Sequence, residues 1–367
     1  MAPDDFNQQP EELSRLFADL FRINAVYRQN EYVIFSLEYQ FDKDKSILAI
    51  KDRLDTAGFN FKLNDQGETL LLSINPERTN KIPLLNLVLF AATLFTVYFV
   101  PVFYKKSAIS SSFREALDAT FAALKAGAGL EFTIAMISIL FIHEMGHFIA
   151  GRRRQIITSW PYFIPAPNII GTFGAIIKSK SPFWNRRDLI EVGAAGPIAG
   201  WVVAIGWLIY GLTQSRIIAP EFTAMTGDMV FALEGESILM RLITLGIIGP
   251  ASDGQFYLLS EAAFAGWVGL LVTAINLLPI GQLDGGHILY GLFRSKQKIL
   301  AAIAMIALLA LGIQSPMWWF FAAFGLFFGI KHPPTLDDSR PISRAALIMA
   351  VVSIVILILS FTPVPFR

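Results

Sequence analysis

The chain has 367 residues, of which 54% are hydrophobic and 16% are charged. Soluble domains carry about 25% charged residues, so this composition predicts a polytopic membrane protein. The net charge of +1 gives no indication of nucleic-acid binding, and the absence of cysteine excludes disulfides and thiolate metal ligands. The N-terminus is acidic and lacks an apolar stretch, so we expect no cleavable signal peptide.

Residues 1–80 have the pattern of a small soluble α+β module. Helical spacing and strand-like alternation of apolar residues predict helices over 11–23 and 46–57, and strands over 32–39, 59–63 and 69–74. This order of elements is compatible with a ferredoxin-like fold. The module contains no histidine, so we expect a scaffold or regulatory role for it rather than catalysis.

Seven apolar runs further along the chain predict transmembrane helices, with six to eight compatible with the pattern. They cover residues 83–104, 130–150, 189–212, 262–280, 299–313, 317–330 and 343–360. The apolar piece 238–248 is too short to span a membrane comfortably. We therefore expect an α-helical polytopic membrane protein, with a membrane-embedded core over 81–300 and additional transmembrane helices over 301–367.

Lysine and arginine predict the orientation of these spans. They cluster directly after the run 130–150, in the loop that follows it, and after the run 262–280. Alternating spans bring these clusters to one side, which the positive-inside rule assigns to the cytoplasm or its equivalent. We expect the N-terminus on that side of a prokaryotic cell membrane, or on the stromal side of a plastid or thylakoid membrane as the alternative.

The sequence His143-Glu144-Met145-Gly146-His147 closes the second apolar run. On a helix, this spacing puts both imidazoles on one face, where they can bind one zinc ion at about 2.0–2.1 Å. Glu144 between them can take a proton from water. A single buried histidine is usually a core residue whose nitrogens are hydrogen-bonded. Two histidines and an acid at membrane depth carry a high free-energy cost, and this cost favours a metal site.

A catalytic zinc site usually has three protein ligands, and Asp284 is the best candidate for the third. It lies in the stretch 276–287, at the end of an apolar run and beside two glycines. The simpler alternative is an aspartate that starts a helix. His287 competes as third ligand, although we favour a supporting position behind the ligands. We expect His332, beside two prolines, to be structural.

These motifs resemble the site-2 protease family, the intramembrane zinc metalloproteases of peptidase family M50. Residues 143–147 look like its first signature and 276–284 like its second. Gly171-Thr172-Phe173-Gly174 looks like the third, and 196–200 also matches. The resemblance covers roughly 80–300, and the layout is similar to the EGY-like plastid and cyanobacterial branch and to archaeal relatives. The loop 213–255 is too short for a PDZ domain, and no region of the size of tandem CBS domains follows the core.

The resemblance implies a role for each matching residue. His143, His147 and Asp284 would hold one Zn²⁺, and Glu144 would pass a proton from water to the leaving amine. Asn276 resembles the asparagine thought to help bind the substrate or its oxyanion.

The stretch of residues Gly171, Thr172, Phe173 and Gly174 resembles a β-like loop that dips into the membrane. A transmembrane substrate must unwind before its backbone can be cut, and an extended loop could then pair with it as an added strand. An ordinary re-entrant loop without substrate contact is the alternative.

The sequence thus predicts an intramembrane zinc metalloprotease that acts on transmembrane helices of other proteins within the lipid bilayer. A catalytically silent scaffold of the same fold is one alternative. A metal transporter is another, although the chain has one compact cluster of ligands and no convincing internal repeat. Hydrolysis of soluble peptides is a weaker possibility. Substrate identity, activating signal and oligomeric state are not indicated.

Overall fold

A computed structural model describes residues 10–29, 32–65, 67–75, 82–154, 156, 158–180, 183–219, 230–231, 236–330 and 332–365. Two units can be distinguished by their internal contacts. Unit 1 consists of residues 1–83 together with 152–159 and 178–182. Unit 2 contains the remaining residues and carries all four histidines of the chain.

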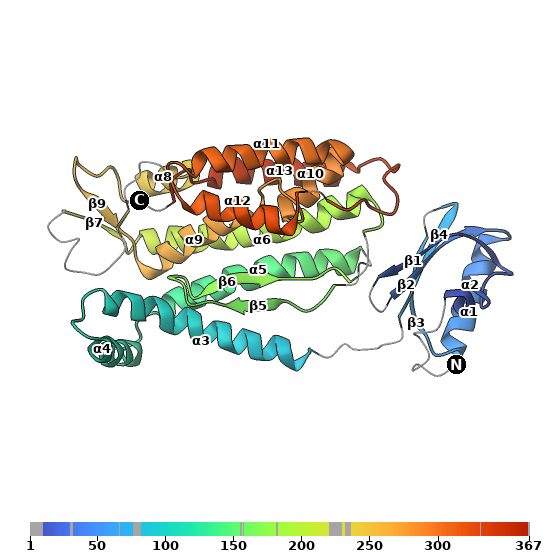
Figure 1. The fold of residues 1–367 in the computed structure, drawn as a ribbon, viewed down its shortest axis with the longest axis horizontal. Coiled ribbons are helices and arrows are strands. Elements are labelled where there is room, and N and C mark those ends of the chain that lie inside the picture. The colour runs from blue at the N-terminus through green and yellow to red at the C-terminus, as the bar shows by residue number, and fades with distance from the viewer. Residues whose placement is uncertain are drawn as a thin grey trace. The chain divides into compact units, whose positions relative to one another are not determined.

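Unit 1 contains a four-stranded antiparallel sheet with the strand order β1-β2-β4-β3. Its elements are α1 (Pro10–Ser14), β1 (Phe21–Gln29), β2 (Tyr32–Tyr39), α2 (Lys43–Thr56), β3 (Asn60–Asp65) and β4 (Thr69–Asn75). Both helices lie on one face of the sheet (Figure 1). The strands follow the predicted alternation of apolar and polar residues. Phe35 of β2 and Leu72 of β4 point to the helical face, where they pack with Ile50 and Leu54 of α2.

Two predictions for this module are wrong. The predicted helix 11–23 ends at Ser14, and β1 begins at Phe21 after a series of turns. Leu13, Phe17 and Phe21 are buried as their spacing requires, but Phe21 pairs with Tyr39 of β2, and tertiary strand pairing outweighs local helical periodicity. The fold is also not ferredoxin-like, since β1 and β2 form a hairpin and one helix separates it from the hairpin of β3 and β4.

Unit 2 is a helical assembly with short strands between some of its helices. Its first elements are α3 (Leu84–Ser107), α4 (Phe113–Lys125), α5 (Leu130–Arg153), β5 (Tyr162–Pro165), β6 (Thr172–Ile176) and α6 (Arg186–Leu212). They are followed by β7 (Arg216–Ile218), β8 (Val230–Phe231), α8 (Ile238–Ile247), β9 (Phe256–Leu258) and α9 (Glu261–Asn276). The last are α10 (Asp284–Phe293), the short 3₁₀ helix Arg294–Lys296, α11 (Gln297–Leu311), α12 (Met317–Phe328) and α13 (Arg344–Ser360).

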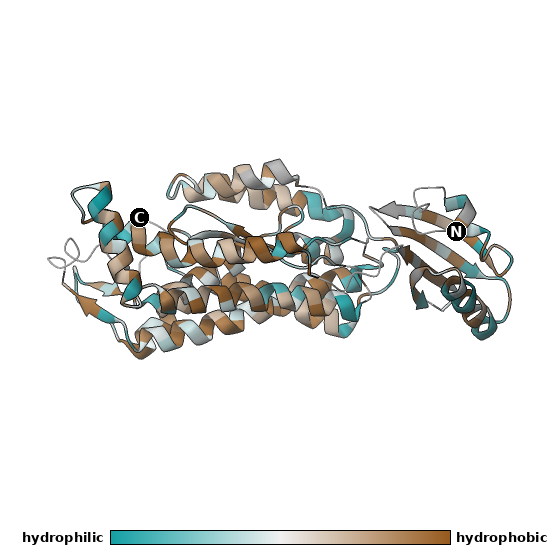
Figure 2. Ribbon diagram, turned by 90° about the horizontal axis from the view of Figure 1, so that it is seen from below, coloured by the Kyte–Doolittle hydropathy of each residue, from teal (hydrophilic) through white to brown (hydrophobic). Residues whose placement is uncertain are grey.

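Three described helices are long and apolar enough to cross a membrane, namely α3, α5 and α6. The predicted count of seven spans is not confirmed, because the other four apolar runs form helices of only 12 to 17 residues. The predicted span 262–280 in particular ends early, as α9 stops at Asn276 and a turn follows. Hydrophobic residues cover the lengths of the helices in unit 2, whereas hydrophilic residues gather near helix ends (Figure 2).

Helix α6 is the centre of unit 2, and α9, α10 and α13 pack along it. The main core lies between α5, α6 and α9, where Ile139, Leu208 and Trp267 are almost fully buried. Small residues of α6 let these neighbours approach its backbone closely. A second core joins α6 and α10 to α13, so the C-terminal helix α13 also supports the part of the unit that carries the histidines.

An antiparallel hairpin of β5 and β6 follows α5 in the chain. Strand β5 runs beside α3, β6 pairs with β5, and the start of β6 also contacts α3 (Figure 1). Among the described strands, β6 pairs with β5 alone, so one of its edges is open. The side chains of Phe173 and Ile176 on β6 are exposed.

Candidate metal centre

Helix α5 carries His143, Glu144 and His147. All three are removed from solvent, with side-chain exposures of 6% for His143 and 12% for His147. His143 lies ten residues before Arg153, the last residue of the helix, and His147 lies six before it. At 1.5 Å per residue, the two residues lie about 15 Å and 9 Å from that end, inside the helix rather than at its terminus.

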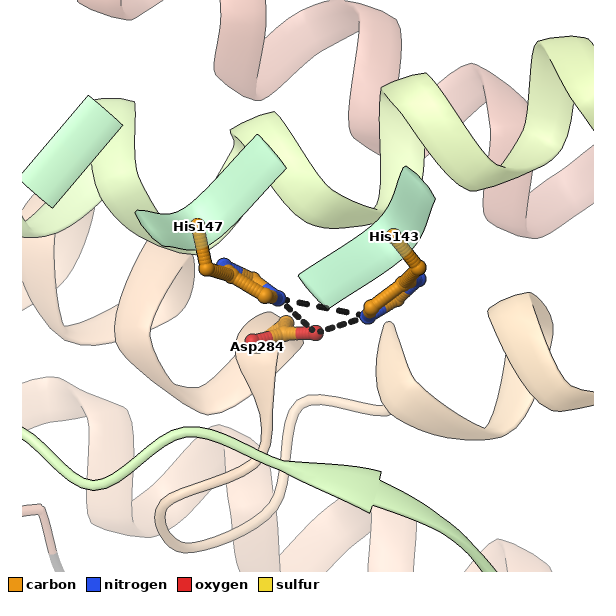
Figure 3. A group of neighbouring side chains, drawn as sticks. All are labelled: His143, His147 and Asp284. Carbon is orange, nitrogen blue, oxygen red and sulfur yellow. Dashed lines mark hydrogen bonds and ion pairs between the residues drawn. The ribbon is translucent and has the colours of Figure 1, made fainter. Parts of the chain in front are cut away.

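Asp284 reaches the same place from a sequence position more than a hundred residues away. Helix α9 ends at Asn276, residues 277–283 turn back, and Asp284 is the first residue of α10. Backbone bonds from Ile280 to Leu278 (2.8 Å) and from Leu283 to Ile280 (3.1 Å) tighten the turn. The carboxylate of Asp284 lies beneath the imidazoles of His143 and His147 (Figure 3).

The three side chains direct one atom each at a common point. Nε2 of His143 lies 3.2 Å from Nε2 of His147. Oδ2 of Asp284 lies 3.4 Å from the first of these nitrogens and 3.3 Å from the second. Four ligands placed tetrahedrally at about 2.0–2.1 Å from a zinc ion are separated by about 3.3–3.4 Å. The spacing therefore fits a tetrahedral divalent metal, with two neutral imidazoles and one carboxylate as donors.

The backbone of α6 fixes His147. Nδ1 of His147 lies 2.8 Å from the carbonyl oxygen of Val192. Because a carbonyl can only accept, the ring proton sits on Nδ1, and the lone pair of Nε2 faces the common point. Gly196 makes room for this ring, since a Cβ atom there would lie 2.1 Å from Nε2 of His147. The small residues at 196–200 therefore accommodate the imidazoles.

Two further polar groups adjoin the three ligands. Glu144 is buried, and its Oε2 has no hydrogen-bond partner in the described structure. A buried carboxylate oxygen without a partner is unfavourable unless a bound group or water completes the site. The amide nitrogen of Asn276 lies 3.4 Å from Nε2 of His143, so Asn276 adjoins the ligands. Together these groups support a metal and a reacting water at this position.

The predicted loop forms the turn and the second strand of the β5–β6 hairpin. Gly171 precedes β6 with a φ of +82°, and a Cβ atom there would meet the backbone of Thr96 and Val97 on α3 at 2.5 Å. Thr172, Phe173 and Gly174 lie in β6. Two side-chain hydrogen bonds hold the turn: Nδ2 of Asn168 donates to the carbonyl of Thr172, and the hydroxyl of Thr172 donates to the carbonyl of Ile164. The described hydrogen bonds connect none of these residues to the three ligands.

His287 lies outside the set of three ligand atoms. Its Nδ1 is 2.6 Å from Nε2 of His332. No sequence pattern pairs these two histidines, because 45 residues separate them and His332 stands in a proline-containing loop. The carbonyl of Val192 was also not foreseeable, since a backbone group has no signature in the sequence.

Comparison with known proteins identifies a protein family that matches this part of the chain. The model of Peptidase family M50 matches residues 131–315, which contain every ligand candidate. The chain is 30% identical over 246 residues to "Probable zinc metalloprotease EGY1, chloroplastic" of Arabidopsis thaliana, covering 65% of this chain and 43% of that protein. It is 31% identical over 219 residues to "Probable zinc metalloprotease EGY2, chloroplastic" of Oryza sativa subsp. indica, covering 58% and 39%.

A more distant relative has the same type of name. "Probable zinc metallopeptidase EGY3, chloroplastic" of Arabidopsis thaliana is 25% identical over 226 residues, covering 56% of this chain and 38% of that protein. The matches therefore span less than half the length of these relatives. No solved structure matches the chain significantly.

Proposed function

The chain belongs to peptidase family M50, and we propose that it is a zinc endopeptidase that cuts peptide bonds within or near the transmembrane helices of other proteins. One observation carries this proposal. His143, His147 and Asp284 lie at metal-ligand spacing inside a helix bundle, beside the buried acid Glu144. Helix α5, which carries three of these four residues, is long and apolar enough to span a membrane. The site would therefore lie at the same depth as a peptide bond within the membrane.

The donor set supports zinc as the metal. Two imidazoles and one carboxylate are typical of zinc sites that keep a fourth position open for chemistry. A zinc ion bound there supplies Lewis-acid polarisation of the scissile carbonyl and activates water for attack. The names of the plant relatives, which include zinc, are consistent with this choice.

Glu144 and Asn276 divide the remaining chemistry. The unpartnered Oε2 of Glu144 can accept a proton from the attacking water and then deliver it to the nitrogen of the leaving amine. Asn276 can donate an N–H from its amide to the developing oxyanion, because this amide lies next to His143. Removing one such donor typically costs about 3 kcal/mol in the barrier.

The open edge of β6 suits a substrate that has lost its helical hydrogen bonds. A helix must unwind before its carbonyls can be attacked, and each freed backbone group in a membrane needs a new partner. Strand addition to β6 would supply such partners. Exposed Phe173 and Ile176 could contact side chains of the added strand. An ordinary hairpin that supports α3 without touching substrate is the alternative.

Replacing Ala175 by proline tests the role of β6. Proline removes one backbone N–H and fixes φ, so it should disturb the strand without touching the metal ligands. We expect cleavage of a single-span helix in proteoliposomes to fall at least about tenfold, because strand addition depends on main-chain bonds. Zinc content, measured by mass spectrometry, should stay at the wild-type level. Ala175→Ser keeps the N–H and serves as control, and unchanged cleavage by Ala175→Pro would contradict the substrate role.

The metal itself can be tested on the purified full-length chain. We expect about one zinc per chain, loss of cleavage of a labelled single-span helix after chelation, and recovery on adding zinc. Asp284→Ala should lose both zinc and cleavage, whereas Asp253→Ala, which changes an exposed loop acid, should lose neither. Wild-type protein without stoichiometric metal would refute the proposal.

The same preparation separates the alternatives. Full zinc content without any cleavage would favour a scaffold of the same fold. Zinc accumulation inside the liposomes would favour a transporter. The described ligand cluster gives no support to transport, because its three ligand residues form one compact group.

A plastid membrane is the location that the plant relatives support, since their names describe them as chloroplastic. They do not support the preference for a prokaryotic cell membrane. The stromal or cytoplasmic position of the N-terminus stays a prediction from the distribution of lysine and arginine. Accessibility labelling of cysteines introduced near residue 40 would test it, because the chain has no cysteine of its own.

A further inference from the structure

The segment between α12 and α13 is bound to the part of unit 2 that carries the candidate metal ligands. We refer to residues 332–340 as the strap. Backbone N–H groups of Leu336 and Asp337 donate to the carbonyls of Phe183 and Trp184 (3.0 and 2.9 Å). Arg186 at the start of α6 donates to the carbonyl of Arg340 (2.8 Å). The family match ends at residue 315, so the strap lies outside it.

His332 is one of the strap residues that contact α10. It is only 3% exposed, and its Nε2 lies 2.6 Å from Nδ1 of His287. Its ring stacks on Tyr290, with 4.8 Å between the ring centroids. The side chain of Gln297 accepts from the backbone N–H of His332 and donates to the carbonyl of Ile330. The imidazole is thus held on several sides and has little freedom to rotate.

The protons of this histidine pair can be assigned. Nδ1 of His332 lies within hydrogen-bond distance of the carbonyl oxygen of Pro333. A carbonyl only accepts, so Nδ1 of His332 carries a proton, and its Nε2 is the acceptor in the neutral ring. Nδ1 of His287 must therefore donate to His332. The carbonyl of Pro333 fixes the direction of both hydrogen bonds.

His287 shares a helix face with Asp284. The two residues are three positions apart in the first turn of α10, and such residues lie on the same side of a helix. Both adjoin Gly193 of α6, where a Cβ atom would lie 3.0 Å from Cβ of His287 and 3.3 Å from the carbonyl oxygen of Asp284. The preceding residue, Val192, holds His147 through its carbonyl. Two consecutive residues of α6 therefore contact the metal site: Val192 holds His147, and Gly193 packs against Asp284 and His287.

We propose that His332 is a positioning residue of the metal site, which acts through His287 to hold the first turn of α10, and with it Asp284, against α6. This inference rests on the proposed metal site. It assigns a role to a residue from the C-terminal segment, outside the family match. Groups that support metal ligands from behind commonly alter metal affinity or activity by about 10- to 100-fold when they are lost.

Two substitutions at His332 separate hydrogen bonding from packing. His332→Phe keeps a ring to stack on Tyr290 but removes the acceptor, which leaves the buried N–H of His287 unpaired. His332→Gln places a carbonyl oxygen where Nε2 was and can accept again. Tyr290→Phe is the matched control, because it removes only the bond from Tyr290 to Asp338 of the strap and keeps the stacked ring.

The measurement is the zinc dissociation constant of each full-length variant in detergent, obtained by competition with a chromogenic chelator. We expect His332→Phe to weaken zinc binding about 10- to 100-fold. We expect His332→Gln and Tyr290→Phe to stay close to wild type. Absorption spectra of the Co²⁺-loaded proteins should change for His332→Phe alone, since they report ligand geometry rather than fold stability.

Three results would overturn the inference. In the first, His332→Phe binds zinc as wild type does. In the second, Tyr290→Phe weakens binding equally, which would mean that any loosening of the strap has this effect. In the third, the wild-type chain binds no zinc, and this result alone would refute the proposed function as well.

Discussion

Glu144→Gln is expected to lower the rate of peptide-bond cleavage by roughly 10²- to 10⁴-fold while zinc content stays at one per chain. The amide has nearly the same shape as the carboxylate but cannot accept the proton of the attacking water. None of the three ligand atoms belongs to Glu144, so the metal should remain. Cleavage of a labelled single-span helix and metal analysis of the same preparation would measure both quantities.

The matched control for this variant is Glu131→Gln, which changes an acid in the first turn of the same helix, far from the ligands. It should cleave as wild type does. The Glu144 variant should also retain uncut substrates, so crosslinking in native membranes would identify them as single-span proteins enriched on the variant. Normal cleavage by Glu144→Gln would contradict the assignment of the proton carrier. Loss of zinc in that variant would contradict the assignment of the ligands.

Gly196→Ala is expected to abolish metal binding through a single methyl group. The added Cβ would lie 2.1 Å from Nε2 of His147, far inside van der Waals contact and on the atom that should face the metal. The ring cannot simply turn away, because its Nδ1 is bonded to Val192 on the same helix. We expect zinc affinity to fall by more than about 100-fold, since one of three protein ligands is displaced.

Gly206→Ala provides the comparison on the same helix. A Cβ atom at Gly206 would meet nothing within 4 Å. Alanine also favours helix more than glycine does, so this variant should fold and bind zinc normally. Thermal unfolding of both variants in detergent would show whether Gly196→Ala retains the fold. Unchanged zinc affinity in Gly196→Ala would mean that His147 does not bind the metal through Nε2.

The metal site was the most predictable part of the molecule. The spacing of His143 and His147 places them on one helix face without any knowledge of tertiary structure. Asp284 could be chosen because an acid at the end of an apolar run is costly unless it binds a partner or a metal. The structure brings these three residues together, while their binding of a metal stays a prediction.

Other features depended on contacts that sequence patterns do not contain. The segment 11–23 has helical spacing, yet its second half becomes a strand because β2 offers a pairing edge. Four of the apolar runs predicted as spans form helices of 12 to 17 residues. Hydropathy shows where apolar residues are but does not show where a turn interrupts them, as at 277–283. The pairing of His287 with His332 required the path of the strap.

The depth of His143 and His147 within α5 has a consequence for the products. A membrane span needs about 20 apolar residues. The imidazoles lie ten and six residues before the end of the 24-residue helix, so a substrate helix lying alongside would be divided unequally. The fragment toward the Arg152 side would keep about ten apolar residues or fewer, too few to hold it in the bilayer. If the proposed cleavage takes place, this fragment would leave the bilayer on that side and the longer fragment would stay embedded, so the position of the ligands along α5 would set the direction of release.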